Sequence, residues 1–210
     1  MPRPTVEAAQ TRGGIPSPHA DERMMVRPMR PDEAEEVGAI TLAGYDTYGR
    51  IEGAYRAFLA DPSARIDGCT ALLVAELDGR LAGTVTYVLP GDAQWEGRAV
   101  DDGDAGFRVL AVAPHAEGKG VGRALVEACL ARSRARGCRR VIITSMAWMT
   151  RAHRLYEGSG FVRRPDLAVR FPSGDGVVFT LDLVPGAAEH FPPPGPVPEE
   201  LPWFEDAWTV

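Results

Sequence analysis

The stretch EGKGVGRALVEACL, residues 117–130, restricts the fold more than any other part of this sequence. An apolar run over 105–113 precedes it, and a second one, RRVIITS over 139–145, follows it. After the glycines, four apolar residues recur with the period of one helical face: Val121, Leu125, Ala128 and Cys129. Strand, glycine-rich turn, helix and strand in that order predict a βαβ unit over 106–145, whose two strands lie parallel and adjacent.

The rest of the chain predicts antiparallel strands and further helices. The Asp78-Gly79 pair, between two strand-like runs, is typical of a hairpin turn. Strands are expected at 24–29, 69–77, 81–89 and 176–183, and helices at 46–67, at 150–158 and from Asp32, the expected N-cap. Together with the βαβ unit, these elements predict an α+β fold with a mixed, mostly antiparallel sheet.

The chain divides into three parts by composition. Residues 1–22 are rich in Pro, Gly, Ala and charge without periodicity, which predicts a disordered tail. Residues 23–184 carry all the periodic segments and have the length of one domain. Residues 185–210 predict an extended Pro-rich arm, and we expect Trp203 and Trp208 to dock its tip onto its own domain or onto a partner.

Composition and charge exclude several classes of function. The formal net charge of −6 argues against a nucleic-acid partner and is compatible with an amine-bearing small substrate. The four histidines are scattered and the three cysteines show no CxxC spacing, so we expect no metal site and reduced thiols in the cytoplasm. We find no apolar leader and no run near the roughly 18 apolar residues of a membrane span, so no membrane contact is expected.

The glycine loop itself predicts an anion site. The first N–H groups of a helix lack intrahelical acceptors and the helix dipole adds positive charge there, so phosphates bind without side chains. Neither common nucleotide loop fits: the spacing is not GxxxxGK followed by Ser or Thr, and Arg123 occupies the third glycine position of GxGxxG. A tight turn without a ligand is the alternative that spacing alone leaves open.

Two segments taken together resemble a known family. The hexad Glu117–Gly122 after VLAVAPHA, and the segment AHRLYEGSGF over 152–161, are similar to the two sequence hallmarks of the GNAT superfamily, the acetyl-CoA-dependent N-acetyltransferases. The resemblance extends over about residues 24–184. It implies a GNAT-like fold, in which the central sheet has a splayed parallel strand pair and helices on both faces.

The resemblance implies that acetyl-CoA is the cosubstrate and that two backbone segments hold it. Its diphosphate would contact N–H groups of the loop and first helical turn, here Gly118, Lys119, Gly120, Val121, Gly122 and Arg123. The side chains of Lys119 and Arg123 could add charge. Its pantetheine arm would pair, like an added strand, with Leu110, Ala111 and Val112. This pairing requires the strand before the loop to splay from the strand at 139–145.

Tyr156 matches the family's tyrosine that protonates the leaving thiolate, a task that suits a phenol because its pKa is close to that of a thiol. Packing beneath the coenzyme is the alternative role for this side chain. A backbone N–H near Leu110 would polarise the thioester carbonyl. The general base is not identified: Asp101, Asp102 and Asp104 are candidates, and a solvated acidic loop is the alternative.

Two positions depart from the family pattern. Met149 stands where many members have Asn, which implies the loss of a polar contact to the pantetheine or the carbonyl. Glu117 replaces Gln or Arg, so we expect its carboxylate to face solvent or to pair with a neighbouring base such as Lys119.

The sequence therefore predicts an acyltransferase that moves the acetyl group of acetyl-CoA to a primary amine of a small molecule, by direct attack in a ternary complex. The alternatives are a protein N-terminal or lysine acetyltransferase and a non-catalytic acetyl-CoA-binding module. A homodimer remains open. Candidates to line the acceptor site are Ser145, Met146 and Trp148, and three tyrosines are either core or pocket residues: Tyr45, Tyr48 and Tyr55.

Overall fold

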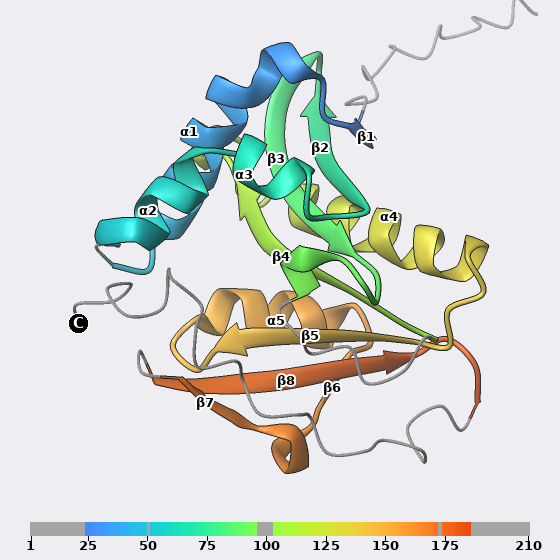
Figure 1. Ribbon diagram of the computed structural model, residues 1–210. Helices are drawn as coiled ribbons and strands as arrows, with labels where there is room; N and C mark the ends of the chain where they lie inside the picture. The colour runs from blue at the N-terminus through green and yellow to red at the C-terminus, as the bar shows by residue number, and fades with distance from the viewer. Residues whose placement is uncertain (1–23, 50, 96–102, 172–173, 186–210) are drawn as a thin grey trace, which may run out of the picture.

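The computed structural model describes residues 24–49, 51–95, 103–171 and 174–185 (Figure 1). The expected N-terminal tail lies outside these residues, and so does the expected C-terminal arm apart from Pro185. No helix in the described ranges is long and apolar enough to cross a membrane.

Within the described residues, eight strands form one sheet in the order β1-β2-β3-β4-β5-β8-β6, with β7 paired to β8. They are β1 (Met24–Pro28), β2 (Ala71–Leu77), β3 (Arg80–Val88), β4 (Asp104–Val112), β5 (Arg140–Met146), β6 (Val162–Arg163), β7 (Val169–Phe171) and β8 (Gly174–Asp182). Every pair is antiparallel except β4 with β5, so the predicted mixed, mostly antiparallel sheet is confirmed. The sequence predicts no strand at β7, which is three residues long and forms by pairing with β8.

The helices are α1 (Ala34–Asp46), α2 (Gly53–Ala60), α3 (Ser63–Ile66), α4 (Val121–Ala135) and α5 (Thr150–Gly158). The helical region expected at 46–67 is the pair of short helices α2 and α3. The prediction that Asp32 caps the first helix is wrong. A 3-10 turn, Pro31–Glu33, precedes α1, and the Glu33 carboxylate closes it by accepting the backbone N–H of Arg30 at 2.7 Å.

Helices cover both faces of the sheet (Figure 1). Because side chains alternate along a strand, Leu73 and Ala75 of β2 pack in one cluster with residues of α4, whereas Leu72 and Val74 pack in another with residues of α1. Burying each such leucine contributes roughly 1.5–3 kcal/mol. The central strands are therefore apolar along most of their length, since neither face meets water.

The parallel pair is short. β4 and β5 pair at only three positions, from Asp104 opposite Arg140 to Gly106 opposite Ile142. A buried ion pair between the Asp104 carboxylate and the Arg140 guanidinium, at 2.6 Å, lies at this closed end. Beyond Gly106 the strands diverge, and no other described strand pairs with that side of β4. The predicted βαβ unit and its splay are both present.

Candidate functional site

The glycine loop has the conformation of an open anion cradle at the N-terminus of α4. Gly118 and Gly120 adopt φ values of +75° and +83°, which only glycine adopts without strain. A Cβ added at either position would meet no atom within 4 Å, so the space beside the loop is open. The first intrahelical bond runs from Ala124 N–H to Gly120 O at 3.0 Å, which leaves the N–H groups of residues 121–123 without intrahelical acceptors.

Gly122 has a different role from its two neighbours. Its backbone is helical, and an added Cβ would lie 3.1 Å from Leu155 Cδ2 of α5. This glycine therefore permits close packing of α4 on α5 beside the loop. Lys119 and Arg123 are exposed at the same place, where their charges can reach a bound anion.

Glu117 forms an ion pair, but not with Lys119. Its two carboxylate oxygens accept from Arg151 of α5 at 3.2 and 2.9 Å. Both side chains are exposed, so the pair contributes little to stability. Its position beside the loop matters more, because the guanidinium screens the carboxylate that would otherwise repel an anion there.

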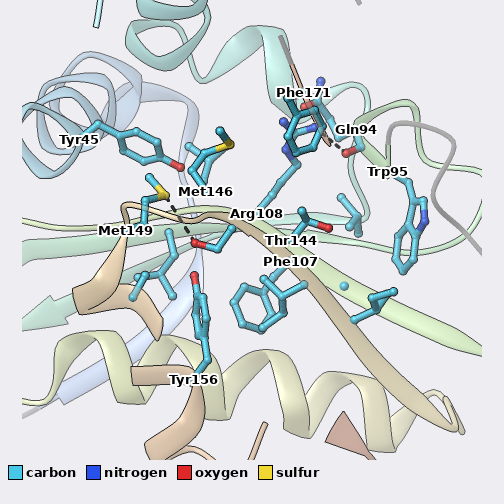
Figure 2. Close-up of a pocket in the computed structure, with 18 of the residues that line it drawn as sticks. Tyr45, Gln94, Trp95, Phe107, Arg108, Thr144, Met146, Met149, Tyr156 and Phe171 are labelled. Atoms are coloured by element: carbon cyan, nitrogen blue, oxygen red, sulfur yellow. Dashed lines mark hydrogen bonds between the residues drawn. The ribbon is translucent and has the colours of Figure 1, made fainter. Parts of the chain in front are cut away.

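A cavity of about 160 Å³ opens where β4 and β5 separate (Figure 2). Aromatic side chains form much of its wall, and Tyr45, Tyr48 and Tyr55 are among them, so these tyrosines are pocket residues. Ser145 and Met146 line the cavity as expected, and backbone and side chains of β4 from Gly106 to Leu110 form the opposite wall. Trp148 does not line it; its ring packs on Tyr48 with centroids 5.6 Å apart.

Tyr156 projects from α5 into this cavity (Figure 2). The side chain is only 6% exposed, and its ring packs edge-on against Phe107 and Phe179. Burial raises the pKa of its hydroxyl above the ordinary value for a phenol. Its hydroxyl makes no hydrogen bond to any described residue. The group is thus a neutral phenol near pH 7 that can still donate its proton.

β4 carries a bulge at the cavity. Thr84 pairs with Ala111 and Thr86 with Arg108, so Val109 and Leu110 together face one residue of β3. Val109 has φ of +48°, a left-handed conformation that is strained for a β-branched residue. A bulge leaves one residue outside the regular ladder, so backbone groups at this point can serve a ligand instead of β3.

Met149, the residue that precedes α5, contacts Ser145 of β5. The Ser145 hydroxyl donates to Met149 Sδ at 3.5 Å, and both side chains are buried in the cavity wall (Figure 2). A thioether therefore stands where the family pattern has an amide, and it accepts a weak hydrogen bond within the protein.

Of the three candidate general bases, only Asp104 is among the described residues, and it does not line the cavity. It is buried in its ion pair with Arg140, and Asp101 and Asp102 lie outside the described residues. In the part of the chain that the structure describes, no Asp or Glu lines the cavity. No group of three His, Cys, Asp or Glu side chains among these residues could hold a metal ion.

Sequence reasoning missed the polar groups at the far end of the cavity. Arg108 lines it and donates to the backbone oxygen of Gln94 at 2.9 Å, and Gln94 and Trp95 line it too. The guanidinium carbons of Arg65 and Arg108 lie 5.9 and 5.8 Å from the centroid of one ring, that of Phe58. One signal for this site was in the sequence: Arg108 is the single charged residue inside the apolar run AGFRVLAVA.

Comparisons with known proteins agree with this geometry. The sequence model described as "Acetyltransferase (GNAT) family" matches residues 34–161. A mycothiol acetyltransferase of Cellulomonas flavigena is 35% identical over 165 residues, which cover 77% of this chain but 46% of that protein, so the chain spans less than half of this relative.

Solved structures share the fold. A GNAT-family acetyltransferase of Staphylococcus aureus Mu50 has a TM-score of 0.60 at 14% identity, over 77% of this chain and 100% of that one. A GNAT-family acetyltransferase of Brucella melitensis, solved in complex with acetyl-CoA, has a TM-score of 0.55 at 22% identity, over 83% and 94%.

Proposed function

Because this chain belongs to the acetyltransferase (GNAT) family, we propose that it transfers the acetyl group of acetyl-CoA to a primary amine of a small molecule. The observation that carries the proposal is the divergence of β4 from β5 beside the open glycine loop. Within the described residues, this divergence leaves the edge of β4 that faces β5 unpaired beyond Gly106, and that edge runs from the cavity to the glycine loop. The opening at Gly118 and Gly120, where an added Cβ meets nothing, fits a diphosphate at backbone contact distance.

We assign coenzyme binding to two backbone segments. The backbone N–H groups of Gly118, Gly120, Val121, Gly122 and Arg123 bind the diphosphate, whereas the N–H of Lys119 donates to Ala116 O at 3.3 Å. The side chains of Lys119 and Arg123 add charge. The edge of β4 at Leu110, Ala111 and Val112 pairs with the pantetheine amides. When bound, acetyl-CoA supplies an acetyl thioester at the cavity.

The residues at the cavity then have separate tasks. A backbone N–H at the bulge, near Leu110, donates to the thioester oxygen and stabilises the charge that develops there. Tyr156 gives its proton to the departing sulfur, and the resulting phenolate takes a proton from the newly acylated nitrogen. Because burial raises the pKa of this hydroxyl, the group is protonated before the reaction begins. The aromatic walls exclude water, which favours the amine over water as the attacking group.

A thiol-release assay tests the proposal. Free coenzyme A is measured while the protein is incubated with acetyl-CoA and a panel of primary amines, including small amines, peptides with free N-termini and lysine peptides. Amine-dependent release with small amines supports the proposal. Preference for peptides would favour a protein acetyltransferase, and coenzyme binding without release on any amine would favour a non-catalytic module.

Tyr156→Phe is the matching active-site variant. We expect kcat to fall by roughly 100-fold or more, the usual effect of losing a general acid, while the Kd for acetyl-CoA changes less than about twofold. Tyr87→Phe is the control, since it removes another buried phenol hydroxyl, hydrogen-bonded to Ser133 at 3.1 Å and outside the cavity. An unchanged kcat in Tyr156→Phe would remove this residue as the acid.

A further inference from the structure

Among the described residues, Arg108 brings a positive charge to one end of the cavity. The Arg108 side chain lies in the cavity wall beside Gln94 and Phe171 (Figure 2). Its guanidinium carbon is 5.8 Å from the centroid of the Phe58 ring, and that of Arg65 is 5.9 Å from the same centroid. Two cations therefore share one aromatic ring at the end of the cavity where β3 and the 3-10 turn Ala93–Trp95 meet β4.

Arg65 is buried without a counter-charge. The side chain is 0% exposed, and its Nε and Nη1 atoms have no hydrogen-bond acceptor. Its Nη2 reaches only the Thr41 hydroxyl, at 3.5 Å. Burial lowers the pKa of Arg65 to about 10, so it remains protonated at neutral pH. A buried cation of this kind requires compensation that the surrounding described residues do not provide.

The surroundings strengthen the case for an anion. No carboxylate from the described residues lines the cavity, although the whole chain has a net charge of −6. Trp95, which lines the same end, has a buried Nε1 donor without an acceptor. Buried donors that lack acceptors destabilise the free protein, and an incoming acceptor atom would offset that cost.

The remaining walls restrict the rest of the ligand. Tyr55, Phe107 and Phe171 present apolar ring surface, and the cavity of about 160 Å³ has room for a small molecule. A single guanidinium in the wall matches a carboxylate in shape and charge, because its planar N–H pairs can bind both oxygens of one carboxylate.

Resting on the acetyl transfer proposed above, we propose that the acceptor is a primary amine that also carries a carboxylate and an apolar body, as an apolar amino acid does. Arg108 binds the carboxylate, and Arg65 on the same Phe58 ring raises the positive potential at that point. The amine then lies toward Tyr156, which projects into the same cavity.

Paired substrates test this without any variant. Phenylalanine, leucine and methionine are each compared with their carboxamides at equal pH. The amide's amine is less basic and more of it is neutral, so reactivity alone favours the amide. We expect kcat/KM to be at least tenfold higher for the acids, as an Arg–carboxylate contact predicts. Equal rates or faster amides would overturn the proposal, and so would a preference for O-phosphoethanolamine over every carboxylate.

Arg108→Gln locates the subsite. The loss in kcat/KM is expected to be at least tenfold larger for phenylalanine than for its amide, and Arg108→Lys should recover part of the difference. Arg56→Gln is the control, because Arg56 pairs with Asp46 at the surface and lies outside the cavity. A similar loss for acid and amide in Arg108→Gln would contradict the assignment. Retained acetyl-CoA affinity verifies that each variant is folded.

Calorimetry with the full chain separates this proposal from the acetyl transfer itself. Phenylalanine, N-acetylphenylalanine and phenylalaninamide are titrated into the protein with coenzyme A present. Binding of the two carboxylates at least tenfold tighter than the amide supports the subsite even if no amine is ever acetylated. Equal or undetectable binding of all three would refute the subsite even if acetyl transfer to other amines is observed.

Discussion

Arg65 illustrates how a single residue can oppose the stability of its own fold. Its contact with the Phe58 ring gives about 0.5–2 kcal/mol, whereas a buried donor without an acceptor costs about 1–3 kcal/mol, and Arg65 has two such atoms. The cost of the two unsatisfied donors therefore exceeds the gain from the ring contact, and Arg65 destabilises the free protein. Residues held at such a cost are found mainly where a ligand uses them.

Arg65→Met should therefore stabilise the free protein. The substitution replaces a buried cation by an apolar chain of similar length, and Thr41 keeps its hydrogen bond to Val37 O at 2.7 Å. We expect a gain of about 1 kcal/mol or more, seen as a rise in Tm of roughly 2–4 °C. Differential scanning calorimetry measures it, with exposed Arg56→Met as the control. A fall in Tm would mean that the protein already compensates the charge.

For single residues, the sequence predicted a structural role only where neighbouring residues in the chain determine that role. The glycine-rich turn before α4 was predicted, and Gly118 and Gly120 adopt positive φ in it, because the conformation of this turn is set by neighbouring residues. Arg65 and Glu117 depend on partners distant in the sequence. Nothing in DPSARIDG indicates that its arginine is buried, and nothing near Glu117 indicates Arg151 as its partner.

Among the elements, α4 has the most demanding start, because each of the three glycines before and in its first turn is required there. The loop before it combines two glycines that are required by backbone conformation with Gly122, which is required by packing on Leu155. The strands and helices of the βαβ unit were predictable because their periodicities are strong and local. β7 was not, since three residues carry no period and the strand exists only through β8.

The glycines of this loop should respond differently to alanine. Gly120→Ala places a side chain at φ of +83°, which costs roughly 1–2 kcal/mol and displaces the N–H groups, so acetyl-CoA affinity should fall at least tenfold. In Gly122→Ala the nearest contact of the new methyl is the flexible end of Leu155 at 3.1 Å, and Val112 Cγ2 at 3.6 Å is at ordinary contact distance, so we expect a smaller loss of affinity. Fluorescence titration of the coenzyme compares the two. Equal losses would argue against a diphosphate on the loop.

For the molecule as a whole, a cluster of four charged residues attaches β1 to its neighbours: Arg27, Arg30, Glu33 and Glu76. Arg27 of β1 donates to Glu33 ahead of α1 at 2.8 Å and to Glu76 of β2 at 3.0 Å. The hydrogen bond from Arg27 lowers the pKa of Glu33 to about 2 from an ordinary value of 4.5. This cluster joins the sheet edge to the helix layer.

Acid should weaken this attachment in a defined pH range. Because the pKa of Glu33 is lower in the folded state, its stabilisation is complete above about pH 4.5 and is lost as the pH falls toward 2. The difference between 4.5 and 2 corresponds to at most about 3 kcal/mol. Urea unfolding measures the free energy of unfolding. We expect this free energy to be lower for Glu33→Gln than for the wild type at pH 7, and the difference between the two proteins to become smaller at pH 3. Asp46→Asn, at an exposed pair, is the control; a constant difference for Glu33→Gln would contradict the assignment.

The divergence of β4 and β5 is the feature of the whole molecule that local patterns could not predict. The sequences of β4 and β5 are those of ordinary apolar strands. Only the resemblance to a family implied that the two strands separate after a short paired segment. The reason is physical: divergence depends on what packs into the gap, and Tyr45, Met146, Met149 and Phe171 come from four different segments.

Among the described strands, only three paired positions join the ladder of β1 to β4 to the ladder of β5, β6, β7 and β8, and one apolar cluster packs against both. Backbone pairing between the two is confined to the closed end, so the side chains that pack into the gap set its width beyond Gly106. Redesign for larger acceptors could therefore begin with cavity-lining residues of β5 such as Thr144 and Ser145, which leaves Tyr156 and the glycine loop in place.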